Sequence, residues 1–228
     1  MRLLFEVEIC PMEESTLGLE MGQLIRPCLL TGSSALNYAK ENGLFKDNTV
    51  KISQRKRGER YLELLEESKK QETSDTVGCL VMENGHIVVA SSSGGNWLKQ
   101  PGRGGLCSVP GAGAWCEDGV GCVCSGYGEC FMRSLFAKRC CDLRGTAEEI
   151  AELMQNTLLK DMQQMKITLD PVFAVAFLDE RQSAMHIVHS STHFGFGYRS
   201  ETTSQVEISE KTNTQQFQIH TIHIFHLC

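Results

Sequence analysis

Two apolar runs flank an Asn-Gly pair near the middle of the chain. The first run covers residues 76–82 and the second covers residues 86–90, with Glu83, Asn84 and Gly85 between them. Asn and Gly both tolerate a positive φ, so the pair predicts a tight β-hairpin. Both runs are apolar nearly throughout instead of alternating with polar residues. This pattern indicates two strands that are covered on both faces.

The next part of the chain carries helical patterns. Residues 129–141 predict one helix, with Phe131, Leu135 and Phe136 as core contacts. Thr146 and Glu149 have the spacing of a capping box, in which each side chain bonds the backbone amide of the other residue. Residues at helical spacing then predict one buried face. They are Ile150, Leu153, Met154, Thr157 and Leu158.

A second strand pair follows the helices. Residues 172–178 form a buried-type strand, residues 179–182 a turn, and residues 184–189 a partner strand. Residues 218–226 are compatible with an edge strand near the end of the chain. The order of strand pair, helix pair and strand pair predicts a layered α+β sandwich, because an exposed sheet must be buried against another layer.

The first 75 residues are organised differently. Residues 26–31 predict a short strand, and Ser33 can cap a helix that runs to Lys40 and ends at Asn42-Gly43. Residues 51–74 are strongly charged and predict a solvated helix that leads into a linker. The alternative for that segment is a nuclear-import patch followed by an exposed loop that precedes a cleavage point.

Composition narrows the class of protein. The chain has 228 residues and a formal net charge of −6, which argues against general affinity for nucleic acid. No stretch of the sequence is long and apolar enough to predict a membrane span. The segment from Met1 to Glu6 contains an acid and is not followed by a small-residue cleavage site. We therefore interpret it as the start of a folded segment and not as a signal peptide.

Eleven cysteines raise three alternatives: a disulfide scaffold, a zinc site, or reduced and mostly buried thiols. The count is odd and no secretion signal is visible, which disfavours disulfides. Cys122 and Cys124 are separated by one residue and Cys140 and Cys141 by none, which does not match the usual zinc spacings. Buried thiols are favoured, which predicts a reducing compartment, the cytoplasm and nucleus. His220, His223 and His226 in one strand would point to different faces, so no metal and no cofactor is predicted.

A specific chemical signal lies at Asp75 and Thr76. If the peptide bond between them breaks, Thr76 carries both a hydroxyl nucleophile and a free α-amine. The ordinary pKa of an α-amine is roughly 7.7–8.0, which suits a base near neutral pH. On local pattern alone, the competing interpretation of Thr76 is an ordinary strand residue.

Several ordered motifs follow that threonine and resemble the type-2 asparaginase family of N-terminal-nucleophile hydrolases. The likeness is greatest to its threonine aspartase (taspase) branch. The matching segments are Asp75-Thr76-Val77-Gly78, Ser92-Ser93-Gly94-Gly95, Lys99 with Pro101-Gly102-Arg103-Gly104, Gly111-Ala112-Gly113 with Trp115, and Ser125-Gly126-Tyr127-Gly128-Glu129. The resemblance implies an αββα sandwich. It extends more weakly to residues 27–32 and 189–198.

The resemblance also implies roles for particular residues. Thr76 would be the nucleophile, freed by autoproteolysis after Asp75, and Ser93 would hold its hydroxyl or amine. Arg103 would bind a substrate carboxylate through its guanidinium fork. Ser125 and the Gly126 amide would form an oxyanion hole, with Gly126 also contacting the substrate.

Within this resemblance, the expected function is an endopeptidase that cuts after aspartate in protein or peptide substrates. Self-cleavage after Asp75 would break the same type of bond. Leu106 also stands where asparaginases carry an aspartate that binds the substrate α-amine. Two alternatives remain open: an asparaginase or β-aspartyl-peptidase, and an impaired paralogue that pairs with a full-length chain.

The segment before Thr76 is shorter than in the family, and no glycine-rich loop is visible there. We therefore expect an incomplete sandwich with exposed apolar strands. Residues 1–50 would be a remnant of the α-subunit, residues 51–75 a charged helical linker, and residues 76–228 the β-subunit-like catalytic segment with a divergent tail. An α/β heterodimer after processing, or a homo-oligomer, is the expected assembly.

Overall fold

The computed structural model describes residues 32–44, 76–93, 103–167, 170–200, 203–212 and 214–223. The chain divides into two units, one formed by residues 8–71 and one that contains residues 72–228. The first unit contributes helix α1 (Gly32–Glu41), which confirms the expected helix. The helix begins at Gly32, so Ser33 lies inside its first turn and the prediction of Ser33 as its cap was wrong. The predicted strand at 26–31, the charged segment 51–74 and Asp75 lie outside the described residues.

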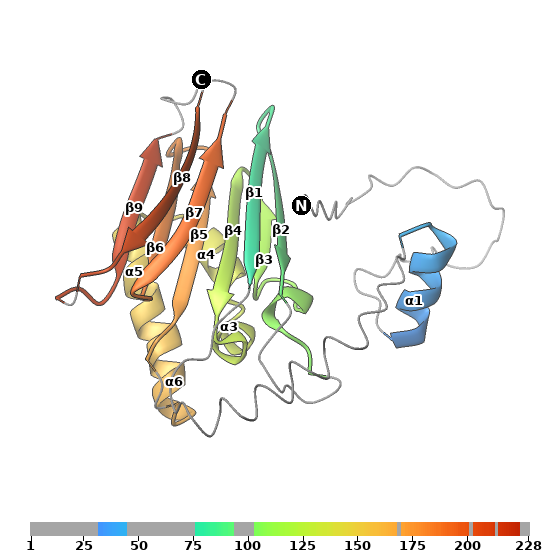
Figure 1. The fold of residues 1–228 in the computed structure, drawn as a ribbon, viewed down its shortest axis with the longest axis horizontal. Coiled ribbons are helices and arrows are strands. Elements are labelled where there is room, and N and C mark those ends of the chain that lie inside the picture. Colours follow the sequence, from blue (N-terminus) through green and yellow to red (C-terminus); the bar gives the residue numbers. More distant parts are fainter. Residues whose placement is uncertain are drawn as a thin grey trace. The chain divides into compact units, whose positions relative to one another are not determined.

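A five-stranded antiparallel sheet organises the second unit (Figure 1). Its spatial order is β3-β4-β5-β6-β9. The strands are β3 (Ala114–Glu117), β4 (Val120–Gly126), β5 (Phe173–Asp179), β6 (Ala184–His189) and β9 (Gln218–His223). The β5–β6 pair and the edge strand β9 confirm the strands expected there. Ser125 and Gly126, two of the predicted site residues, are the last two residues of β4.

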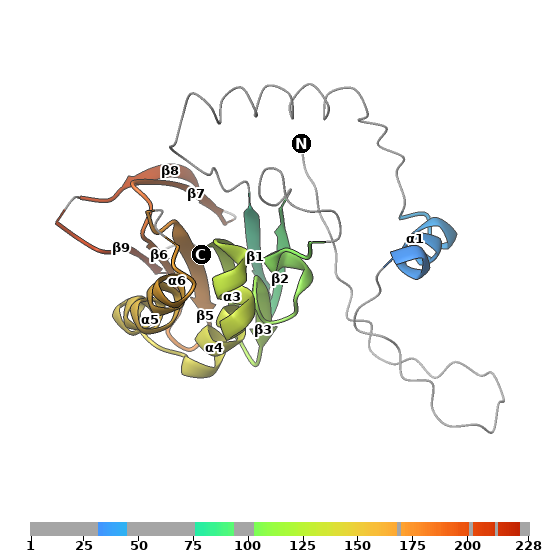
Figure 2. The ribbon, with the colours of Figure 1, turned by 90° about the horizontal axis from the view of Figure 1, so that it is seen from below.

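Helices cover one face of this sheet, as Figure 2 shows. They are α3 (Gly128–Ser134), α4 (Phe136–Leu143), α5 (Ala147–Met154), the π-helix η2 (Gln155–Leu159) and α6 (Lys160–Gln164). The capping box at Thr146 and Glu149 is present with both of its hydrogen bonds. Ile150, Met154 and Leu158 are fully buried against the sheet.

The helix expected over 129–141 is in fact two helices. Leu135 adopts a left-handed conformation between α3 and α4, with φ of 48°. Phe131 and Phe136 are buried as predicted, but Leu135 is exposed. The prediction of Leu135 as a core residue was wrong because the helical spacing on which it depended is interrupted at that residue.

Two separate strand pairs cover the other face of the sheet. The first is β1 (Val77–Glu83) with β2 (His86–Ser92), and the second is β7 (His193–Arg199) with β8 (Ser204–Glu210). The turn of the first pair has φ of 52° at Asn84 and 77° at Gly85, which confirms the predicted hairpin. The predicted α+β class is likewise confirmed.

The expectation that β1 and β2 are covered on both faces was wrong. Leu80 on one face meets Gly121 of the central sheet, whereas Val77, Val81 and Val88 on the other face are exposed. Within the described part of this unit, no helix covers that outer face. The apolar character of the strands therefore produces an exposed apolar surface, as the incomplete sandwich predicts.

Candidate active site

Thr76 and Ser93 lie opposite each other at the open end of the β1–β2 hairpin. Thr76 precedes β1, Ser93 follows β2, and Val77 pairs with Ser92 between them. The Thr76 hydroxyl donates a hydrogen bond to Ser93 Oγ at 3.1 Å. Both side chains are part-buried. The hairpin register therefore orients the predicted nucleophile toward a second hydroxyl.

The β1–β2 pair stacks on β4, with the start of β1 toward the end of β4. A Cβ built on Gly78 would lie 2.7 Å from Val123, and one built on Gly121 would lie 3.2 Å from Leu80. The absence of these side chains permits the close approach. Thr76 stands two residues before Gly78, and Ser125 stands two residues after Val123. The contact between Gly78 and Val123 therefore brings the start of β1 close to the end of β4. Figure 1 shows the start of β1 and the ends of β2 and β4 at one end of the sandwich.

Gly126 has a backbone that excludes any larger residue. Its φ is 141°, a region that residues with a Cβ rarely adopt. A Cβ built there would lie 2.2 Å from the Val172 carbonyl oxygen and 2.9 Å from the Phe173 ring. The turn from β4 into α3 is therefore tied to glycine at this position. It places Ser125 and the Gly126 amide side by side at the end of β4.

Arg103 lies over the start of α3 and is held by Glu129. Arg103 Nε donates to Glu129 Oε1 and Nη2 donates to Oε2, both at 2.8 Å. The Arg103 side chain is 17% exposed and that of Glu129 is 44% exposed. The guanidinium predicted to bind a substrate carboxylate thus already holds a carboxylate of this chain. Sequence reasoning assigned no role to Glu129, although it closes the Ser125-to-Glu129 motif.

Leu106 is part of the core, with 4% of its surface exposed. It opens the short helix η1 (Leu106–Ser108), and its backbone would be 2.7 Å from a Cβ on Gly113. An apolar side chain in this environment has no means of pairing with an ammonium group.

Comparison with known proteins identifies the family. The model of the asparaginase family matches residues 26–206 of this chain. The chain belongs to the asparaginase family. It is 34% identical over 125 residues to a plant-type L-asparaginase of Pyrobaculum calidifontis, covering 50% of this chain and 42% of the relative. It is 40% identical over 79 residues to a probable isoaspartyl peptidase/L-asparaginase of Drosophila pseudoobscura pseudoobscura, covering 34% of this chain and 24% of the relative.

A third relative is the probable isoaspartyl peptidase/L-asparaginase 2 of Arabidopsis thaliana. The identity is 37% over 65 residues, which cover 28% of this chain and 20% of the relative. The matched stretches thus span less than half the length of these asparaginase-family relatives. The names of all three relatives describe L-asparaginases or isoaspartyl peptidases.

Five cysteines of this asparaginase-family chain belong to the core formed by β4, α3 and α4. They are the buried thiols Cys122, Cys124, Cys130, Cys140 and Cys141. Burial raises the pKa of Cys122 and of Cys140 well above the ordinary value, and it raises the pKa of Cys130 to about 12. Such thiols stay protonated near neutral pH.

Within the described residues, no group of three or more histidine, cysteine or acidic side chains has the geometry of a metal site. No helix among them combines the length and the apolar character needed to cross a bilayer.

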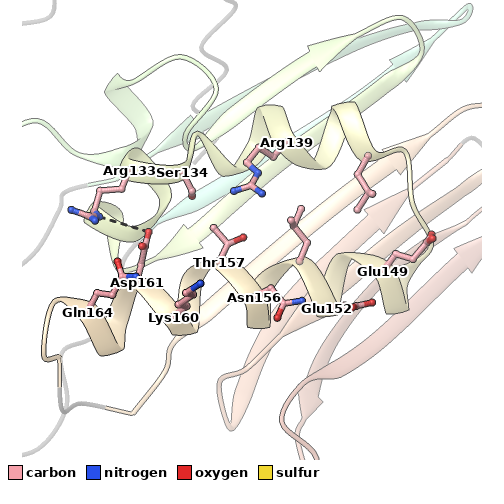
Figure 3. A pocket seen from close by; sticks show the side chains of 12 residues that line it. Arg133, Ser134, Arg139, Glu149, Glu152, Asn156, Thr157, Lys160, Asp161 and Gln164 are labelled. Carbon is pink, nitrogen blue, oxygen red and sulfur yellow. Dashed lines mark ion pairs between the residues drawn. The ribbon is translucent and has the colours of Figure 1, made fainter.

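A groove also runs along the helical layer (Figure 3). It has a volume of about 730 Å³ and runs between α3–α4 and α5–α6. Arg133 and Asp161 form an ion pair of 3.8 Å at one end, and Glu149 at the other end is part of the capping box. Charges of both signs line this groove, and none of the predicted site residues does.

Proposed function

We propose that this chain is an N-terminal threonine amidohydrolase that acts on L-asparagine or on β-aspartyl peptides. The hydrogen bond between Thr76 and Ser93 carries the proposal, because it holds the hydroxyl at the end of the sandwich where Ser125 and Gly126 also lie. Membership of the asparaginase family and the names of the relatives support the substrate class.

The proposed reaction begins with scission of the bond between Asp75 and Thr76. The freed α-amine accepts the proton of the Thr76 hydroxyl, and the oxygen attacks the substrate amide carbonyl. Ser125 and the Gly126 amide stabilise the developing oxyanion. Loss of one such donor typically costs on the order of a hundredfold in rate.

The proton then passes from the α-amine to the leaving ammonia or amine. An ester between Thr76 and the aspartyl group remains, and water hydrolyses it with the α-amine again as the base. Ser93 fixes the rotamer of Thr76 in both steps. No metal or organic cofactor takes part in this scheme.

The second candidate is the endopeptidase that cuts after aspartate. The buried Leu106 favours it, because a peptide substrate brings no free α-amine that would need a partner at that position. The exposed valines of β1 and β2 favour a third candidate, an impaired chain that associates with a full-length family member.

One set of assays separates these candidates. Purified protein is incubated with L-asparagine, with a β-aspartyl dipeptide and with a longer peptide that contains an internal aspartate. The proposal predicts release of ammonia or of the free amino acid from the first two and an intact third. Cleavage of the longer peptide alone would support the endopeptidase. Turnover only after addition of a full-length relative would support the impaired chain.

A further inference from the structure

Ser190 is a buried serine that directly follows β6 and contacts the start of β5. Its hydroxyl donates a hydrogen bond to the Pro171 carbonyl oxygen at 2.9 Å and accepts one from the Phe173 amide at 2.9 Å. The Ser190 amide also donates to the Phe173 carbonyl oxygen at 2.8 Å. One serine therefore holds the peptide groups on both sides of Val172.

These hydrogen bonds fix the direction of the Val172 carbonyl group. That carbonyl and the Phe173 amide belong to one planar trans peptide, so they point in opposite directions. Because the Phe173 N–H points toward Ser190, the Val172 carbonyl oxygen points away from it, toward β4. The oxygen meets Gly126 there, since a Cβ built on Gly126 would lie 2.2 Å from it.

The Val172 carbonyl oxygen and two aromatic rings form the wall against which Gly126 packs. A Cβ at Gly126 would lie 2.9 Å from the Phe173 ring and 3.0 Å from the Phe131 ring. The φ of Gly126 is 141°, and such a conformation persists only where the surrounding structure determines it. The direction of the Gly126 amide therefore depends on this wall, and the carbonyl group in the wall depends on Ser190.

Tyr127 provides a second connection between the same two segments. Its hydroxyl donates to the Asp170 carbonyl oxygen at 3.0 Å, and its ring meets Phe173 edge-on with centroids 5.8 Å apart. That hydroxyl bond is exposed, whereas the bond from the Phe173 amide to Ser190 is buried. A buried hydrogen bond is electrostatically stronger than one in water, so Ser190 is the firmer of the two attachments.

We propose that Ser190 is a positioning residue, which aims the Gly126 amide at the oxyanion by holding the Val172 carbonyl group. This inference rests on the proposed function and extends its oxyanion-binding segment to a residue from a different strand pair. A donor of this kind acts as negative charge develops in the transition state. Ser190 therefore affects the rate of the chemical step and not the binding of the substrate.

Steady-state kinetics of the purified protein on L-asparagine tests this role. Ser190→Ala should lower kcat about tenfold and leave KM within about twofold, because the misdirected donor serves only the transition state. Ser190→Thr keeps the hydroxyl and should recover most of kcat. Ser134→Ala is the matched control, since the Ser134 hydroxyl also donates to a backbone carbonyl, that of Cys130, but at the far end of α3. It should leave kcat and KM within about twofold.

The direction of the Gly126 amide gives a second readout that needs no turnover. In isotope-labelled protein, the residual dipolar coupling of the Gly126 N–H should change in Ser190→Ala, and that of Gly121 in the same strand should not. Ser134→Ala should change neither coupling.

The outcomes separate this inference from the proposed function. Turnover by the parent with an unchanged kcat in Ser190→Ala would overturn the inference alone, and so would equal losses of kcat in Ser190→Ala and Ser134→Ala. A rise of KM at constant kcat would also overturn it. A parent that turns over no amide would instead contradict the proposed function. In that case an unchanged Gly126 coupling in Ser190→Ala would still overturn the inference.

Discussion

The Thr76 hydroxyl donates to Ser93 Oγ across the open end of a hairpin, at 3.1 Å and a sequence separation of 17 residues. The contact depends on register. A slip of one residue between β1 and β2 would turn one of the two side chains to the opposite face. The Asn84-Gly85 turn lies at the far end of the hairpin and helps to fix this register. It therefore helps to determine whether Thr76 and Ser93 meet.

Ser93→Ala should lower the turnover number by about two- to tenfold while the protein remains folded. The variant removes the acceptor that fixes the Thr76 rotamer, and a neutral hydrogen bond of this kind contributes roughly 0.5–1.5 kcal/mol. Steady-state kinetics on L-asparagine measures the effect. Ser92→Ala is the control, since Ser92 pairs with Val77 and belongs to the opposite face of β2. Equal losses in the two variants would contradict the assigned contact.

Gly126→Ala should destabilise the folded chain by about 3 kcal/mol or more. The added methyl group would meet the Val172 carbonyl oxygen, and the backbone would remain in a strained region. Urea unfolding followed by circular dichroism measures this loss. Gly195→Ala provides the comparison, because nothing lies within 4 Å of a Cβ at Gly195. A stable Gly126→Ala variant would show that the turn differs from the one described.

Acidification should weaken the attachment of the β7–β8 pair. His189 Nδ1 donates a hydrogen bond to the Ser191 carbonyl oxygen at 3.0 Å, so the other ring nitrogen, Nε2, is the acceptor. The Ser209 hydroxyl donates to this Nε2 at 2.7 Å. His220 Nε2 in turn donates to the Ser209 hydroxyl oxygen at 2.5 Å. Burial lowers the pKa of His189 below its ordinary value, opposed by the Ser191 carbonyl, while His220 and Lys211 add to the lowering. The unfolded chain therefore binds this proton more readily than the folded one.

Stability is then complete above the ordinary pKa of about 6.5 and falls as the pH drops from there toward the lowered pKa of His189. Burial also lowers the pKa of His186, which acts in the same direction. Urea titrations between pH 8 and pH 5 measure the slope. Replacement of His189 by Gln should make the slope smaller. A slope that does not change in His189→Gln would exclude this network as its source.

Alkylation should distinguish Cys79 from the buried cysteines. Cys79 is exposed on β1, whereas burial raises the pKa of Cys122 and Cys124 and keeps both as protonated thiols. Brief treatment of the native protein with iodoacetamide, followed by peptide mass spectrometry, should label Cys79 at least about tenfold faster than either residue. The same reaction in urea should remove the difference. Rapid labelling of Cys122 in the folded protein would contradict the described core.

Local signals predicted much of this fold. The Asn84-Gly85 turn and the Thr146 capping box each depend on residues close in sequence, and both are present. The β7–β8 pair and the break at Leu135 were not predicted. The break arises from a single left-handed residue inside a helical pattern, and β7 alternates glycine with aromatic residues whose packing partners lie on other strands.

The candidate site was predictable in its residues but not in its contacts. Ordered motifs pointed to Thr76, Ser93, Arg103, Ser125 and Gly126, and their functional roles are still proposals. The pairing of Arg103 with Glu129 was not predicted, because the two residues are 26 positions apart and only the fold brings them together. Asp75 lies outside the described residues, so its part in processing remains a prediction.

The most direct measurement is the intact mass of the purified protein, before and after long incubation at neutral pH. Two fragments are expected, with masses that correspond to scission between Asp75 and Thr76 and with Thr76 as a new amino terminus on Edman degradation. Thr76→Ala should remain a single chain under the same conditions. A parent chain that stays whole, or that breaks at another bond, would contradict the claim that Thr76 becomes its own catalytic base.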